Sequence, residues 1–235
     1  KSSTFHCMNT SANQITQLYL FSFNRNKLWA FKQMGIGYNQ LNGTPHLSFF
    51  RLLGTGGGAG FSLRPDFSTY AFLGVWKNAA AASQFKEEHP FIQDYFEKAS
   101  SIRLLTLSNI KSQGMWGGQN PFLSPQDLSV GNKKVAIITR ATLRWSRLLS
   151  FWRAVPKASK AIEDAKGVYF YKGIGEWPFI QQATISLWDS MENVLQFAYK
   201  SKDHATIVKK THQKKWYTED LFSRFYVEQD EQLKG

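Results

Sequence analysis

Two of the five histidines lie in one lysine-rich stretch, Gln196–Tyr217, and their spacing is the first indication of chemistry. If the stretch is helical, His204 shares a face with Ile207 and Val208, because residues three and four apart lie on one side of a helix. His212 lies eight residues further on, about 12 Å along the axis, so both rings cannot bind one metal ion. No second ligand stands near His204 at metal-binding spacing. Two interpretations remain, a hydrogen-bonded core histidine or the single axial ligand of a haem.

A glycine-rich segment, GTGGGAGF, is the second candidate. It fits the G-x-G-x-x-A pattern of dinucleotide-binding proteins and follows a predicted strand. That pattern requires a helix to begin directly after it, whereas Pro65 and its polar neighbours disfavour one. We expect Gly54–Gly60 to form an irregular loop that borders a cavity, where glycines let the backbone approach a flat ligand closely. The predicted cavity residues are Gly54, Gly56, Phe61, Trp29 and Trp116.

Other polar residues are assigned no role in catalysis. The acidic pair Glu219/Asp220 lies in a polar stretch and is expected to be solvated surface. His46 and His89 each adjoin a proline and are interpreted as structural or surface residues. Cys7 is the only cysteine, which excludes an intramolecular disulfide and a cysteine-based zinc or iron–sulfur site, and fits a reducing cytoplasm.

The composition indicates a globular chain that is rich in large rings. Of its 235 residues 43% are hydrophobic and 15% aromatic, with 8 Trp and 19 Phe, so either an aromatic core or a site for a lipophilic ligand is expected. No apolar run is long enough to span a membrane. The net charge of +12 favours anionic partners. Nucleic acid is not expected among them, because aromatic and basic residues do not alternate as single-strand binding requires.

Hydrophobic periodicity predicts the same order of elements in each half of the chain. In the first half we expect strands over 15–24, 46–56, 68–76 and 102–116 and helices over 27–41 and 78–100. In the second half we expect strands over 135–143, 167–177, 182–188 and 220–229 and helices over 144–164 and 190–216. Pro90 should interrupt the second of these four helices.

This order reads βαββαβ twice, and we therefore predict an α+β fold with two ferredoxin-like repeats. Residues 1–14 form a polar N-terminal extension, 15–113 the first repeat, 114–134 a linker and 135–235 the second repeat. The two sheets would either pack face to face or close into a barrel like that of dimeric αβ-barrel proteins.

The chain resembles the spheroidene monooxygenase (acyclic carotenoid ketolase) family from about Ile15 to Val227. The resemblance rests on the runs KLWAFKQMG, TPHLSFFRLLGTGGGAGFSLRPDFSTYAFLGVW, SQGMWGGQNPF, ITRATLR, KGIGEWPFIQQATISLWDS and FAYKSKDHATIVKKTHQKKWYTEDLFSRFYV. Three positions depart from the family pattern: His46 stands where glycine is frequent, Gln181 where histidine is frequent, and Asp220 where glutamate is usual.

The resemblance implies an O₂-using enzyme that depends on haem b, with His204 as the axial ligand of its iron. We expect it to insert oxygen from O₂ into a lipophilic substrate such as an acyclic carotenoid, with an external electron donor, which could be a protein. Arg64, Arg140 and Arg224 are the candidate partners of the haem propionates. The alternatives are a non-catalytic carrier of haem or a lipophile, and a haem enzyme of the same fold with dehydratase or peroxidase-like chemistry.

The expected location is the cytoplasm, with or without peripheral contact to the cytoplasmic membrane. A cluster of lysines on the last predicted helix would approach anionic lipid, the other interpretation being a solvated helix face. These residues are Lys200, Lys202, Lys209, Lys210, Lys214 and Lys215.

Overall fold

The computed structural model describes residues 14–58, 64–123, 133–200 and 215–235. Its first half contains β1 (Ile15–Ser22), α1 (Lys27–Leu41), β2 (Leu47–Gly56), β3 (Pro65–Trp76), α2 (Ala79–Glu88), α3 (Pro90–Lys98) and β4 (Ser101–Gly114). The predicted break at Pro90 is confirmed. Proline lacks the N–H that would continue α2 and is suited to the first turn of α3.

The second half contains β5 (Val135–Leu143), η1 (Trp145–Arg147), α4 (Leu148–Trp152), α5 (Val155–Glu163), β6 (Val168–Gly175), β7 (Gln181–Trp188), α6 (Met191–Lys200) and β8 (Tyr217–Lys234). The prediction of one continuous helix over 144–164 is wrong, because the chain turns after α4 and Pro156 restarts it as α5. The helix predicted over 190–216 is described only as α6, and residues 201–214 lie outside the described part of the chain.

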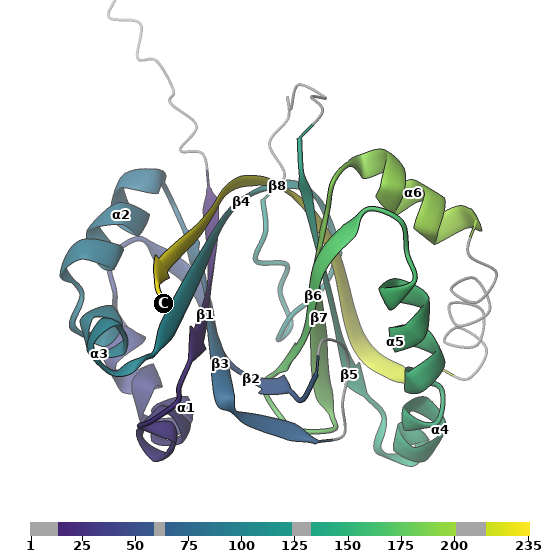
Figure 1. Cartoon of the computed structure of the whole chain (residues 1–235), viewed down its shortest axis with the longest axis horizontal. Coiled ribbons are helices and arrows are strands. Elements are labelled where there is room, and N and C mark those ends of the chain that lie inside the picture. The colour runs from purple at the N-terminus through teal and green to yellow at the C-terminus, as the bar shows by residue number, and fades with distance from the viewer. Residues whose placement is uncertain (1–13, 59–63, 124–132, 201–214) are drawn as a thin grey trace, which may run out of the picture.

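The eight strands close into one antiparallel barrel in the order β1-β3-β2-β6-β7-β5-β8-β4 (Figure 1). Helices α1 to α3 cover one outer face and α4 to α6 the opposite one, on the left and right of Figure 1. The predicted α+β fold, with two βαββαβ units packed as an αβ-barrel, is therefore confirmed.

The two halves of the barrel are connected by strand pairing at two places, and the lengths of these pairings differ greatly. On one side β8 is long enough to pair with both halves, from Leu221 to Lys234 with β4 and from Tyr217 to Tyr226 with β5. On the other side β2 and β6 pair only at Gly54↔Gly175 and Thr55↔Ile174. We call this short join the β2–β6 seam.

Side chains from all eight strands fill the barrel interior with one apolar cluster. Trp116 and Phe122 belong to it, although both lie in the predicted linker over 114–134. Residues 115–123 of that linker therefore enter the barrel and pack there (Figure 1). Residues 124–132 lie outside the described chain.

The outer faces of the two halves are packed differently. Under α1 to α3 a single cluster of buried residues includes Tyr19, Phe72 and Phe91. In the second half the described residues form two separate small clusters, one around Trp188 and α6 and one around Trp216 and α4. The described residues of this face are therefore divided between two apolar clusters.

Candidate functional site

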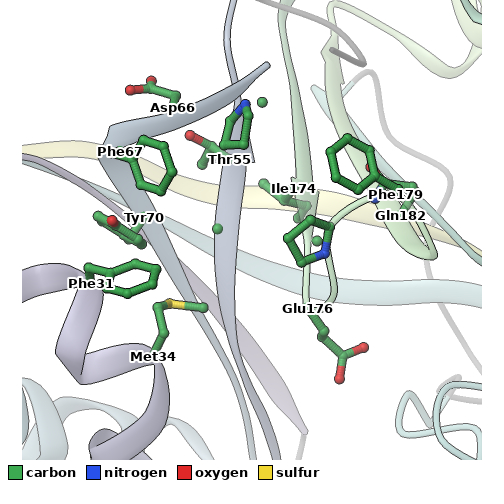
Figure 2. Close-up of a pocket in the computed structure, with 15 residues that line it drawn as sticks. Phe31, Met34, Thr55, Asp66, Phe67, Tyr70, Ile174, Glu176, Phe179 and Gln182 are labelled. Atoms are coloured by element: carbon green, nitrogen blue, oxygen red, sulfur yellow. The ribbon is translucent and has the colours of Figure 1, made fainter. Parts of the chain in front are cut away.

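A pocket of about 170 Å³ lies over the β2–β6 seam, between α1 and the turn that joins β6 to β7. Phe31 and Met34 of α1 and Phe67 of β3 line it from the first half. Ile174 of β6 and Phe179 of the turn line it from the second half. Figure 2 shows these two groups of side chains on opposite sides of the hollow. We call it the seam pocket.

The seam pocket offers a mainly apolar surface, because both acidic side chains in its lining are engaged elsewhere. Asp66 accepts hydrogen bonds from the N–H and hydroxyl of Ser68 and lies 3.6 Å from the Lys172 ammonium. Burial alone would raise the pKa of Asp66, but these bonds and the Lys172 charge hold it below its ordinary value. The Glu176 carboxylate points away from the aromatic rings (Figure 2). A hydrocarbon is therefore the ligand that this lining suits best.

Glycines bring the two backbones together at the floor of the seam pocket. Gly54 faces Gly175 across the seam, and a Cβ at Gly175 would lie 2.6 Å from the carbonyl oxygen of Gln181. The prediction of an irregular loop is wrong for Gly54–Gly56, which belong to β2. Gly54 and Gly56 do line the pocket. The absence of a side chain at Gly175 serves the close approach of β6 to Gln181 at the start of β7, whereas a Cβ at Gly54 would meet nothing closer than the Gly175 carbonyl oxygen at 3.9 Å.

A cluster of buried charges joins four strands beside the seam pocket. Glu176, at the end of β6, lies 2.7 Å from Nε of Arg51 on β2 and accepts a 2.6 Å hydrogen bond from the indole N–H of Trp116. Arg140 of β5 lies 3.7 Å from Oε1 of Glu176, the oxygen that accepts from Trp116, and forms a closer ion pair with Glu219 of β8. We call these five residues the ion cluster.

The ion cluster keeps the Glu219 carboxylate ionised. Burial alone would raise the pKa of Glu219, but the N–H groups of Gly118 and Gly117 and the Arg140 charge together lower it below its ordinary value. Arg140 is only 4% exposed, and its Nε has no hydrogen-bond partner among the described residues. Two arginines facing two carboxylates give a network that is locally neutral and costly to break.

Sequence reasoning missed most of this cluster. The assignment of Glu219 to solvated surface is wrong, since it is bound to Arg140 and to two backbone N–H groups. Arg51 and Glu176 were not singled out. The available signal was a charged residue within a predicted strand, Arg51 in LSFFRLLG and Arg140 in VAIITRATL, because such a position is buried on at least one face of a sheet.

The predicted cavity residues do not come together around one site. Trp29 packs on the outer side of the barrel against Tyr95, with ring centroids 4.9 Å apart. Trp116 is fully buried inside the barrel, where it serves the ion cluster. Phe61 lies outside the described residues.

The candidate haem residues are similarly separated. Arg140 points into the barrel and is bound to Glu219, whereas Arg224 is half-buried on the outer face beside Phe222. Arg64 lies exposed at the start of β3 in the other half. His204 lies outside the described residues, as do most of the lysines predicted to contact lipid.

The outer face of the second half has a band of half-buried polar residues between its two apolar clusters. The band contains Thr139 of β5 and Thr184 of β7, whose hydroxyls are 2.6 Å apart, and Arg224 of β8. Gln182, two residues before Thr184 on the same face of β7, lines the seam pocket. The seam pocket and this band are thus neighbours along one strand.

Two further observations limit the chemistry of the described residues. They contain no group of three His, Cys, Asp or Glu side chains that could hold a metal ion. None of the helices that the structure describes is long and apolar enough to cross a membrane.

Solved structures support the fold. Two aldoxime dehydratases, one of them crystallised with butyraldoxime, each superpose with a TM-score of 0.59 at 11% identity. The alignments cover 93% and 91% of this chain and 81% of each dehydratase. At this identity the likeness concerns the barrel architecture alone.

Sequence relatives are more informative, although no family model matches the chain. It is 30% identical to spheroidene monooxygenase of Rhodobacter capsulatus over 214 residues, which cover 90% of this chain and 89% of the relative. It is also 30% identical to spheroidene monooxygenase of Cereibacter sphaeroides, over 91% of this chain and 67% of the relative. The chain therefore belongs to the spheroidene monooxygenase family.

Proposed function

We propose that the chain is an oxidoreductase that inserts oxygen from O₂ into a C–H bond of a long lipophilic substrate such as an acyclic carotenoid. The observation that carries the proposal is the seam pocket in a chain of this family. Its apolar lining is provided by α1, β3 and the β6–β7 turn, and its two carboxylates are held by other partners. A non-polar chain would enter without leaving a buried charge unpaired.

The size of the seam pocket indicates how such a substrate would bind. A volume of about 170 Å³ is well below the roughly 300–1,000 Å³ of pockets that enclose whole drug-sized ligands. Only one end of a long polyene would be enclosed, and the rest would leave through the mouth. A slender acyclic end fits between Phe31, Phe67 and Phe179 more readily than a bulky cyclic one would.

Haem is the cofactor that we propose, held on the outer face of the second half. What supports this position is the band of Thr139, Thr184 and Arg224, which lies between two separate apolar clusters of described residues. α6 covers this face, and residue 204 follows four residues after its end. His204 would hold the iron and Arg224 a propionate. Arg140 is withdrawn as a propionate partner, because it points into the barrel and is bound to Glu219.

When bound, haem would supply the reductive activation of O₂. Each hydroxylation would consume one O₂, two electrons from an external donor and two protons, and release one water. Two hydroxylations at one carbon followed by loss of water would give a ketone. The residues of the seam pocket would hold the hydrocarbon end and exclude water from it, so that the same carbon is presented twice.

Mass spectrometry with isotopically labelled oxygen tests this reaction. The purified protein is supplied with haem, a chemical reductant and an acyclic carotenoid under ¹⁸O₂. We expect a hydroxylated or keto product that carries the label and does not form without O₂. Binding of the carotenoid without any O₂-dependent product would contradict the proposal and favour a non-catalytic carrier.

Absorption spectroscopy tests the cofactor separately from turnover. A histidine-ligated haem has a spectrum distinct from that of a thiolate-ligated one. His204→Ala should lose haem or accept added imidazole in place of the missing ring, and His212→Ala should keep the parent spectrum. An unchanged haem spectrum in His204→Ala would refute the ligand assignment.

A further inference from the structure

Large apolar side chains are exposed together around the mouth of the seam pocket. We call this set the apolar belt, and its members are between 43% and 77% exposed. They come from α1, β3, the β6–β7 turn and the η1–α4 segment: Phe31, Phe67, Trp177, Phe179, Trp145 and Leu149. Soluble chains seldom gather this many exposed aromatic side chains in one region unless it is an interaction surface.

Contacts between neighbouring side chains make the first part of the belt continuous. The rings of Phe31 and Phe67 lie 6.0 Å apart at an edge-to-face angle. Both line the seam pocket with Pro178 and Phe179 of the β6–β7 turn, so the belt crosses from one half of the barrel to the other at the pocket mouth.

The second part of the belt continues from the turn to α4. Trp152 donates its indole N–H to the carbonyl oxygen of Phe179, and the two rings lie 6.1 Å apart. Leu149 precedes Trp152 by three residues and therefore lies on the same side of α4. The N–H of Leu143 donates to the Ile180 oxygen, which places the start of this segment beside the turn. In Figure 1 the belt elements α1 and α4 lie at the lower left and lower right, with the ends of β2 and β3 between them.

The belt is flanked by positive charge. Exposed cations lie beside it on α1 and on the η1–α4 segment: Lys27, Lys32, Arg144, Arg147 and Arg153. The sequence contains no Asp or Glu between residues 1 and 65 or between 128 and 162, which include both segments. Asp66 is the nearest acid on β3 and is paired with Lys172. An apolar surface with a basic rim is complementary to an anionic bilayer.

We infer that the apolar belt docks the protein on an anionic lipid bilayer, with the mouth of the seam pocket facing the membrane. A second copy of the chain suits this surface less, because an isologous contact would bring two rims of the same charge together. The docking inference depends only on the apolar belt and the cations beside it. Supply of a substrate from the bilayer to the pocket rests additionally on the proposed function.

Vesicle sedimentation of the full chain, without substrate, tests the inference. We expect binding to phosphatidylcholine–phosphatidylglycerol vesicles that weakens in high salt and on vesicles of phosphatidylcholine alone. Arg144→Gln combined with Arg147→Gln should weaken the partition coefficient about 25-fold, at about fivefold for each cation. Trp145→Ser combined with Trp177→Ser should weaken it roughly tenfold or more.

Matched controls come from a different part of the barrel. Leu123 is 69% exposed, close to the 67% of Trp177, and Lys77 is an exposed cation at the far end of β3. Leu123→Ser and Lys77→Gln should leave vesicle binding unchanged, and all variants should unfold at the parent temperature.

Several results would overturn the inference. The first is no binding to anionic vesicles, and the second is full binding by the belt variants. A third is loss of binding only in the Lys209→Gln, Lys210→Gln, Lys214→Gln triple variant, which would assign docking to the lysine-rich stretch. A fourth is a belt variant whose particle mass in solution is lower than that of the parent protein while its vesicle binding is unchanged. This result would make the belt a protein–protein contact. Failure here would leave the proposed reaction untouched, since no substrate is present.

Discussion

Replacing Glu219 with Gln should destabilise the fold by about 2–3 kcal/mol, because it removes one charge from the ion cluster. Breaking a fully buried ion pair costs about 3–5 kcal/mol. The Arg140 side chain is 2% exposed, but Glu219 is 24% exposed, and Arg140 retains Glu176 at 3.7 Å, so we take a value below that range. Gln has one acceptor oxygen where Glu219 has two, so it can keep only one of the two hydrogen bonds from Gly117 and Gly118. For a chain of this size the loss corresponds to about 5–10 °C in the unfolding temperature.

The pH dependence of the effect follows from the pKa of Glu219. Since this pKa is lower in the folded state than its ordinary value, the ionised carboxylate stabilises the fold fully above its unfolded pKa of about 4.3. That stability is lost as the pH falls through the folded pKa. The difference between parent and Glu219→Gln should therefore be largest near neutral pH and shrink in acid.

Urea unfolding at neutral and acidic pH measures both quantities. The matched control is Glu228→Gln, which removes the exposed ion pair that Glu228 forms with Lys133 at 3.2 Å and should cost less than about 1 kcal/mol. An equal loss in Glu219→Gln and Glu228→Gln, or a Glu219 effect that does not change with pH, would refute the reasoning about the cluster.

Three further substitutions address other parts of the fold. Gly175→Ala should destabilise the fold by about 2 kcal/mol in urea unfolding, because its Cβ would lie 2.6 Å from the Gln181 carbonyl oxygen. Gly54→Ala, with nothing closer than 3.9 Å, should be nearly neutral, and equal effects of the two substitutions would contradict the assignment of the close β6–β7 approach to Gly175. Ser186→Ala should cost about 1–2 kcal/mol by the same assay, since the buried Trp188 N–H donates to its hydroxyl, and a neutral result would show that the bond adds nothing. Burial lowers the pKa of His89, so the stability that its neutral ring provides is present above the unfolded pKa of about 6.5 and is lost as the pH falls through the lower folded pKa. His89→Asn should therefore flatten the fall of stability with pH below about 6.5, and an unchanged slope would exclude His89 as its source.

The local pattern of apolar and polar residues was sufficient to predict most strands and helices of the barrel. The helix over 27–41 and the strand over 135–143 were predicted with the bounds that the structure has. His46 adopts a φ of 62°, a left-handed conformation that glycine favours. The left-handed backbone explains why glycine would suit this position, and hydrophobic periodicity carries no information about it.

Contacts between residues that lie far apart in the chain could not be predicted from the sequence. Arg51 and Glu176 meet only because β2 and β6 close the barrel, and nothing near either residue indicates its partner. Glu219 looked solvated because its neighbours in the chain are polar, whereas its actual surroundings come from β5 and from residues 117–118. The seam pocket has the same origin, since its two walls come from different repeats.

Filling the seam pocket tests the central claim most directly. Met34 lines the pocket, whereas Ile36 lies 53% exposed on the same helix and is not among the pocket residues. We predict that Met34→Trp lowers the affinity for an acyclic carotenoid, followed by the shift of its visible spectrum, at least roughly tenfold, since one ring would occupy much of the space. Ile36→Trp should bind like the parent. Equal binding by Met34→Trp, Ile36→Trp and the parent chain would contradict the assignment of the seam pocket as the substrate site.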